Sequence, residues 1–425
     1  MTIGPKSFAP VLAGALALWP LMAYAGAQGF TVLVAIAALL GLVYIRVQKI
    51  ETYAIAGSAF VLWVVAASFW APEAKDLLTG NPFEGSFSMD MPGIRFALTI
   101  LAGIGVLVAT GTVMPASSRT SLNVIVGAIA VQFVGVVVTA LFMPQILALL
   151  APISDPITEM PQNLMRNVNA FALLLPFLMA WVWHRGETIH WQIAAIGICI
   201  FSFAATILTG TQTSMVGIVL MLGCMGVVKV LPKNGFRVLF TTLSIYILTT
   251  PILLSWGLAQ IRALGLPLPR SFFSRTYSWE LVGSKIGDAP LLGHGPEASQ
   301  TWTDTFGDHP EWLADAASRY VDADAWAAYQ VVPIHPHNMP LQTWAETGFI
   351  GVLLVSIFIF LVGRELKPPA DWPPISKYAA AGLIGMCFAI CSFAYSMWNE
   401  AFWASVMLTS AVILLQARHD GRSAA

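Results

Sequence analysis

Two histidines lie where a long polar segment of the sequence gives way to an apolar one. His335 and His337 are separated by a single proline, Asn338 follows them, and a mostly apolar run begins at residue 341. Imidazole exchanges a proton near neutral pH and can take a proton from a sugar hydroxyl. A histidine at this position is therefore either an anchor at the water–lipid boundary or the base of a reaction on a membrane-bound substrate.

Other polar residues fall at the ends of apolar runs that, on the topology derived below, share one membrane face with these histidines. They are Arg166, Asn167, Asn169, Thr211, Gln212, Thr213, Ser214, Arg270, Arg275 and Glu400. Guanidinium groups bind phosphate oxygens in a bidentate manner, and a diphosphate leaving group needs its charge stabilised as its bond breaks. Tryptophans between residues 260 and 338, including Trp279, suit the apolar faces of sugar rings. Together these residue types indicate glycosyl transfer from a lipid diphosphate.

Several of these residues also have a plainer interpretation. A tryptophan near a membrane surface is most often an interfacial anchor, and Arg270 has acidic residues nearby with which to pair. The histidine pair lacks a third metal ligand at a useful spacing, and Asp322 and Asp324 are better explained as a solvated acidic stretch. All four cysteines lie in apolar runs, where thiols behave as small hydrophobes. We therefore expect no disulfide, no metal ion and no cofactor.

The composition is that of a membrane protein. Of 425 residues, 57% are hydrophobic and 10% are charged, whereas a soluble domain carries roughly 25% charged residues. The apolar residues cluster in runs near membrane-spanning length, which predicts an all-α polytopic membrane protein. A net charge of −1 gives no indication of a nucleic-acid partner.

We predict twelve transmembrane helices. They cover residues 10–26, 29–46, 53–70, 95–114, 122–143, 168–184, 191–209, 213–230, 238–259, 341–363, 379–397 and 401–417. The chain then divides into spans one to nine (1–259), a large polar loop (260–338) and spans ten to twelve (339–425). About eighty residues are too few for a large independent core, so we expect this loop to lie over the bundle as a lid. The first run resembles a signal peptide, but we expect it to be retained as a helix.

The charges of the connecting segments alternate along the chain. Lysine and arginine gather on one side, at Lys6, Arg46, Lys49, Arg119, Arg185, Lys229, Lys233, Arg237, Arg364, Lys367, Lys377, Arg418 and Arg422. By the positive-inside rule this side is cytoplasmic. Both termini are then cytoplasmic, and the loop 260–338 faces outward with the histidines and arginines.

Four stretches of the sequence resemble one family of bacterial membrane glycosyltransferases, the O-antigen ligase and polysaccharide polymerase superfamily. They are Arg275-Thr-Tyr-Ser-Trp279 followed by Pro290-Leu-Leu-Gly-His-Gly295, then His337-Asn-Met-Pro-Leu-Gln-Thr-Trp-Ala-Glu-Thr-Gly348, Arg166-Asn-Val-Asn-Ala-Phe-Ala172, and Leu208-Thr-Gly-Thr-Gln-Thr-Ser214. Twelve spans with a large outward loop before the tenth also match this family. The resemblance therefore covers most of the chain.

This resemblance implies a metal-independent transfer on the periplasmic face of the bacterial inner membrane, with the glycan carried by undecaprenyl diphosphate. His337 matches the histidine thought to activate the acceptor hydroxyl, and Arg275 matches an arginine that grips the diphosphate. Gln212 stands where many members have a second arginine. Either Arg166 or Arg270 replaces that charge, or diphosphate binding is weaker. We also expect His335, Asn338, Asn169 and Trp279 to contact substrate.

Two rival functions stay open at this stage. A polymerase of the same family, making O-antigen or exopolysaccharide, would share the chemistry of a ligase acting on lipid A–core and differ only in the acceptor. A twelve-helix transporter has the same plan, with both termini inside. Against a transporter, the spans contain almost no ionisable residues near their middle.

Overall fold

A computed structural model describes residues 7–25, 29–45, 51–72, 91–114, 118–150, 159–264, 268–320 and 323–421. The fold is an all-α helical bundle, and ten of its helices are long and apolar enough to cross a membrane. They are α3 (Thr52–Ala67), α5 (Pro92–Gly111), α6 (Arg119–Leu150), α7 (Glu159–Trp183), α8 (Ile189–Leu208), α9 (Gln212–Val230), α10 (Gly235–Ala263), α14 (Met339–Glu365), α15 (Pro374–Phe393) and α16 (Glu400–Asp420). Two shorter apolar helices, α1 (Ala9–Tyr24) and α2 (Gly29–Gly41), account for the other two predicted spans.

Two helices differ most from their predicted bounds. Helix α7 begins at Glu159 rather than at residue 168, because its first turns are polar and carry no apolar signal. Helix α6 continues past residue 143 to Leu150, with a break in helical geometry at Phe142 two residues before Pro144. Five residues that the sequence analysis named lie outside the described part of the chain: Lys6, Arg46, Lys49, Asp322 and Arg422.

The bundle packs around α7, the most buried of the long apolar helices. Helix α15 lies between α7 and α9, and small residues let these backbones approach closely. A side chain at Gly382 would meet Pro176 of α7, and one at Gly385 would meet the carbonyl oxygen of Leu220 in α9. Close contact through small residues is how helices associate in lipid, where no hydrophobic force drives them together.

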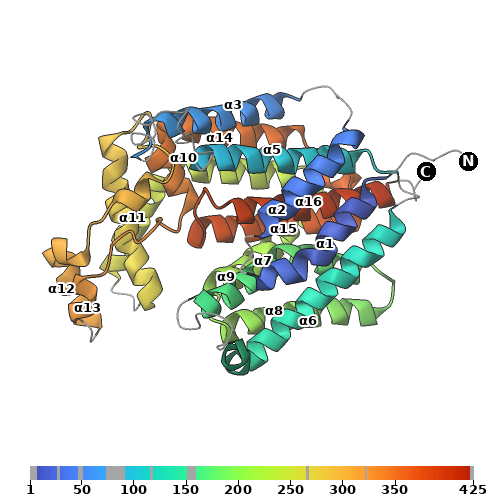
Figure 1. Cartoon of the computed structure of the whole chain (residues 1–425), viewed down its shortest axis with the longest axis horizontal. Helices are drawn as coiled ribbons and strands as arrows, with labels where there is room; N and C mark the ends of the chain where they lie inside the picture. Colours follow the sequence, from blue (N-terminus) through green and yellow to red (C-terminus); the bar gives the residue numbers. More distant parts are fainter. Residues whose placement is uncertain are drawn as a thin grey trace, which may run out of the picture.

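A lobe of short helices caps one end of the bundle. It consists of α11 (Arg270–Asp288), α12 (Pro310–Arg319), α13 (Ala323–Ala327) and the loops among them, and Figure 1 shows it at the left, away from the end of α16. Aromatic side chains, including Phe273, Phe306 and Trp326, form its core. This core continues into Leu258 of α10 and Leu341 of α14, so the lobe and the bundle share apolar packing.

The lobe is also seated in a break in α14. Gly348 interrupts this helix with a φ of +64°, a conformation that glycine adopts without strain. A side chain there would collide with the carbonyl oxygen of Leu291, and one at Gly293 would collide with the backbone of Glu346. The backbone N–H of Gly295 donates to Glu346 O at 2.9 Å. The Pro-Leu-Leu-Gly-His-Gly stretch is therefore a docking loop that fits against the Glu-Thr-Gly of α14.

Candidate functional site

His337 lies in the loop just before α14, and its ring has a defined tautomer. Its Nδ1 lies 2.7 Å from the carbonyl oxygen of Ala394, in the segment between α15 and α16. A carbonyl only accepts hydrogen bonds, so Nδ1 carries the proton and Nε2 holds a lone pair. Within the described residues His337 Nε2 has no hydrogen-bond partner, and this atom is not sealed from its surroundings by burial. The imidazole is thus arranged to accept a proton from an incoming group.

Asn338 and Trp279 hold this loop in place. The Asn338 side chain caps α14 by accepting from the N–H of Leu341 at 2.9 Å, and it donates to the carbonyl oxygen of Ser392 at 3.2 Å. The indole N–H of Trp279 in α11 donates to Pro336 O at 2.8 Å. Both side chains are buried, with 1% and 4% exposed surface. These bonds are those of side chains that position the loop, and the predicted contact with substrate stays a prediction.

Arg275 lies on α11, one turn before Trp279, and is half-buried. Among the described residues no carboxylate pairs with it and no hydrogen bond occupies its guanidinium. Burial lowers the pKa of Arg275 below its usual value, since its charge lacks compensation there. An anion bound beside this guanidinium would restore that balance.

The positive charge of Arg275 acts on both His335 and His337, which indicates that the three groups lie near one another. Burial lowers the pKa of His335 to about 3, and the neighbouring His337 and the charge of Arg275 act in the same direction. Burial also lowers the pKa of His337, which the bond to Ala394 opposes and the charge of Arg275 reinforces. Both imidazoles are therefore neutral at neutral pH, and His337 is present as the free base.

Helices α7 and α9 approach the other side of the Ala394 segment. Asn169 of α7 donates to the Tyr395 hydroxyl at 3.3 Å and accepts from Ser214 of α9 at 2.6 Å. Burial raises the pKa of Tyr395, while the bond to Asn169 and the positive charge of Arg166 lower it. Arg166 thus lies near this hydroxyl, with one nitrogen bonded to the Asn163 side chain at 3.1 Å.

Gln212 and Arg270 are exposed at the rim. Gln212 begins α9, and its side-chain oxygen accepts from the hydroxyl of Ser271, the second residue of α11, at 3.4 Å. Because Arg270 directly precedes Ser271 in the sequence, its backbone lies close to Gln212. Its guanidinium lies 5.2 Å from the ring centre of Trp326. No three His, Cys, Asp or Glu side chains gather as possible metal ligands in the part of the chain that the structure covers.

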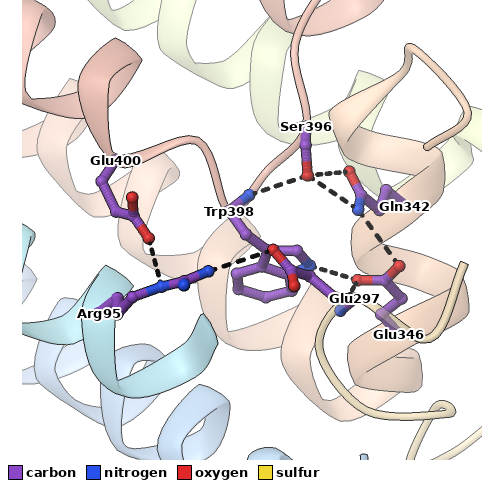
Figure 2. A network of polar contacts seen from close by, with 7 residues as sticks. All are labelled: Arg95, Glu297, Gln342, Glu346, Ser396, Trp398 and Glu400. Carbon is purple, nitrogen blue, oxygen red and sulfur yellow. Dashed lines mark hydrogen bonds and ion pairs between the residues drawn. The ribbon is translucent and has the colours of Figure 1, made fainter. Parts of the chain in front are cut away.

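Sequence reasoning missed a polar network behind the histidine loop, which Figure 2 shows. Glu346 is fully buried in α14 and accepts from four donors. They are the backbone N–H groups of Glu297 (2.9 Å) and Ser299 (3.1 Å), the Gln342 amide (3.2 Å) and the Trp398 indole. Gln342 in turn accepts from the N–H of Met397 at 2.9 Å. The network therefore ties the lobe to the segment that holds His337.

Arg95 adds an ionic contact to this network. It lies in the first turn of α5 and pairs with Glu400 at 2.8 Å and with Glu297 at 3.5 Å. Figure 2 shows its guanidinium between the two carboxylates. An arginine in the first turn of a predicted span was the one available signal, since its partners are distant in sequence.

The family model described as O-Antigen ligase matches residues 197–356. Over these residues the chain is similar to the O-antigen ligase superfamily. Among curated proteins, one of Rickettsia conorii, named as a polysaccharide ligase, is 28% identical over 150 residues, which are 34% of this chain and 33% of that protein. One of Rickettsia typhi with the same kind of name is 29% identical over 133 residues, 30% of this chain and 28% of that protein. The chain thus spans about a third of the length of these relatives. No solved structure matches it.

The O-antigen ligase match contains most of the site. Gln212, Arg270, Arg275, His335 and His337 all lie inside it. The two α7 residues, Arg166 and Asn169, lie before it and reach the site only through the fold. The resemblance drawn from the motifs is confirmed, and so is the all-helical membrane fold.

Proposed function

We propose that the chain is a membrane glycosyltransferase that moves a glycan from undecaprenyl diphosphate to a sugar hydroxyl, without a metal ion. The observation that carries this proposal is that an imidazole free base, His337, lies within the electrostatic influence of Arg275, a guanidinium without a carboxylate partner in the described structure. One group suits proton removal and the other suits a diphosphate. The names of the relatives and the matched family support glycan ligation.

In the proposed reaction, the acceptor hydroxyl gives its proton to Nε2 of His337 as its oxygen attacks the anomeric carbon. The bond between that carbon and the phosphate oxygen breaks, and the electron pair leaves with the diphosphate. Arg275 stabilises the charge that develops on this leaving group. Arg270, at the rim beside Gln212, and Arg166, near Tyr395, are the two candidates for the second positive charge that Gln212 does not supply. Asn169 and Gln212 would orient the substrate.

The lobe end of the bundle would face the periplasm, with the lobe acting as a lid. Basic residues at the opposite end, such as Lys229, Arg237, Arg364, Lys377 and Arg418, support this orientation by the positive-inside rule. The protein would then lie in the bacterial inner membrane with both termini cytoplasmic. Its partners would be a lipid-linked glycan donor, membrane lipids and a glycan acceptor.

Substitution of His337 by asparagine tests the base directly. Asparagine tolerates the φ of +53° at this position, and its amide can still donate to Ala394 O, but it has no atom in place of Nε2. We expect glycan transfer from the lipid diphosphate to fall by about 10²–10⁴-fold, the range for a general base. His309→Asn, in the outer part of the lobe, is the matched control. Transfer by H337N at the rate of this control would refute the assignment.

The acceptor separates two forms of this function. A ligase would transfer the glycan to lipid A–core, and a polymerase would extend O-antigen or exopolysaccharide. In a deletion strain, loss of a ligase leaves unmodified lipid A–core while lipid-linked polymer accumulates. Loss of a polymerase leaves single repeat units instead.

A further inference from the structure

His335 has two ring nitrogens with different surroundings. Its Nδ1 accepts from the backbone N–H of His337 at 3.2 Å, so the ring proton must lie on Nε2. Within the described residues the Nε2–H group of His335 has no acceptor, and this nitrogen is not sealed from its surroundings by burial. This N–H is therefore available to a group that enters the site.

The two imidazoles are adjacent but carry their protons on different ring nitrogens. Their ring centres lie 4.2 Å apart. His337 offers a lone pair at Nε2, whereas His335 offers a proton at the same ring position. The charge of Arg275 acts on both rings, so a diphosphate that pairs with this guanidinium would lie in the same part of the site as the two imidazoles.

His335 also acts on the backbone of its neighbour. His337 has a φ of +53°, a left-handed conformation that residues other than glycine rarely adopt. The bond from its N–H to His335 Nδ1 supports that conformation, which in turn directs the His337 ring toward Ala394.

We propose that His335 has two separable roles: its Nε2–H donates a neutral hydrogen bond to a diphosphate oxygen of the donor lipid, and its Nδ1 holds the left-handed backbone of His337. The inference rests on the proposed function and names a further ligand of the leaving group. A neutral donor suits this place, because a second cation beside Arg275 would be repelled in the empty site.

Two substitutions separate the roles. In His335→Asn the side-chain oxygen takes the place of Nδ1, and nothing takes the place of Nε2. In His335→Gln the amide nitrogen reaches the place of Nε2, and the acceptor at Nδ1 is lost. We expect H335N to raise the KM for the lipid-diphosphate donor about tenfold, as for one hydrogen bond to a charged group, with little change in kcat. H335Q should keep KM and lower kcat. Equal effects of both variants on both constants would overturn the proposal.

A binding measurement keeps this test independent of turnover. The full chain in detergent is titrated with geranyl diphosphate, and binding is followed by thermal stabilisation, with geraniol and inorganic diphosphate as comparison ligands. We expect H335N to weaken geranyl diphosphate binding about tenfold and H335Q and the control His309→Asn to leave it unchanged. Unchanged binding by H335N would overturn the proposal. If wild-type protein binds geranyl diphosphate but transfers no glycan, the proposed function fails while the role of His335 as a diphosphate ligand stands.

Discussion

Replacement of Glu346 by glutamine should destabilise the protein, because it removes hydrogen-bond acceptors from a fully buried site. The carboxylate is fully buried, and all four groups around it are hydrogen-bond donors. Figure 2 shows the Trp398 indole and the Gln342 amide converging on it. A carboxylate can accept from all four, whereas a glutamine side chain has one acceptor oxygen and an NH₂ group that only donates.

The magnitude follows from the number of donors that lose an acceptor. If the glutamine oxygen keeps two of the four bonds, two buried N–H groups are left facing another N–H. Each such group costs about 1–3 kcal/mol, so the loss is about 2–6 kcal/mol. The neutral amide avoids part of the cost of burying a charge, which offsets some of this loss. We therefore expect a net decrease of about 1–4 kcal/mol in the free energy of unfolding.

Reversible unfolding by SDS in mixed micelles, followed by circular dichroism, measures this decrease. Glu365→Gln is the matched control, because the same exchange is made at the exposed far end of the same helix. The control should unfold like the wild type. If E346Q and E365Q unfold at the same SDS fraction, the four bonds do not stabilise the fold and the reasoning is wrong.

Three further outcomes are expected. Because the pKa of His337 is held below 6.5, kcat/KM should stay level from pH 8 to pH 7 and fall only below 6.5, as protonation removes the Nε2 lone pair; a fall centred above pH 7 would contradict this. Gly348→Ala should lower the free energy of unfolding by at least about 1–2 kcal/mol, because alanine is strained in the left-handed backbone conformation; the same SDS titration measures this. Gly223→Ala should not destabilise the protein, because an added Cβ there would have no described atom within 4 Å. Trp279→Phe keeps an aromatic ring but loses the bond to Pro336 and part of the buried ring volume, so stability should fall by at least about 1 kcal/mol. The kcat should fall by a larger factor than the KM changes, and an unchanged kcat would refute the positioning role of Trp279.

The helices were predictable because lipid imposes a local rule on the sequence. A segment that crosses a bilayer must be apolar over roughly 20 residues, and each of the twelve predicted segments contains a helix. The rule fails where a helix leaves the apolar region. The polar first turns of α7, before residue 168, and the extension of α6 to Leu150 illustrate this.

The site was predictable only in part. Spacing alone does not bring Arg275 to His337, and the resemblance of the motifs suggested their pairing. The burial of Trp279 depends on how the lobe packs, so its sequence neighbourhood could not distinguish a substrate surface from a core residue. Glu346 lies within the motif that runs from His337 to Gly348, but two of its donors, the backbone N–H groups of Glu297 and Ser299, come from another part of the chain.

The interlock of the docking loop with Gly348 sets an order for biogenesis. The seat of residues 290–295 is incomplete until the segment up to residue 350 has been synthesised and inserted, because the backbone of α14 forms part of it. A nascent chain halted before α14 would carry α11 and α12 without their partner, exposed to proteases. For the same reason, a hybrid with a related enzyme will assemble only when its exchanged segment runs unbroken from the lobe through the first turns of α14.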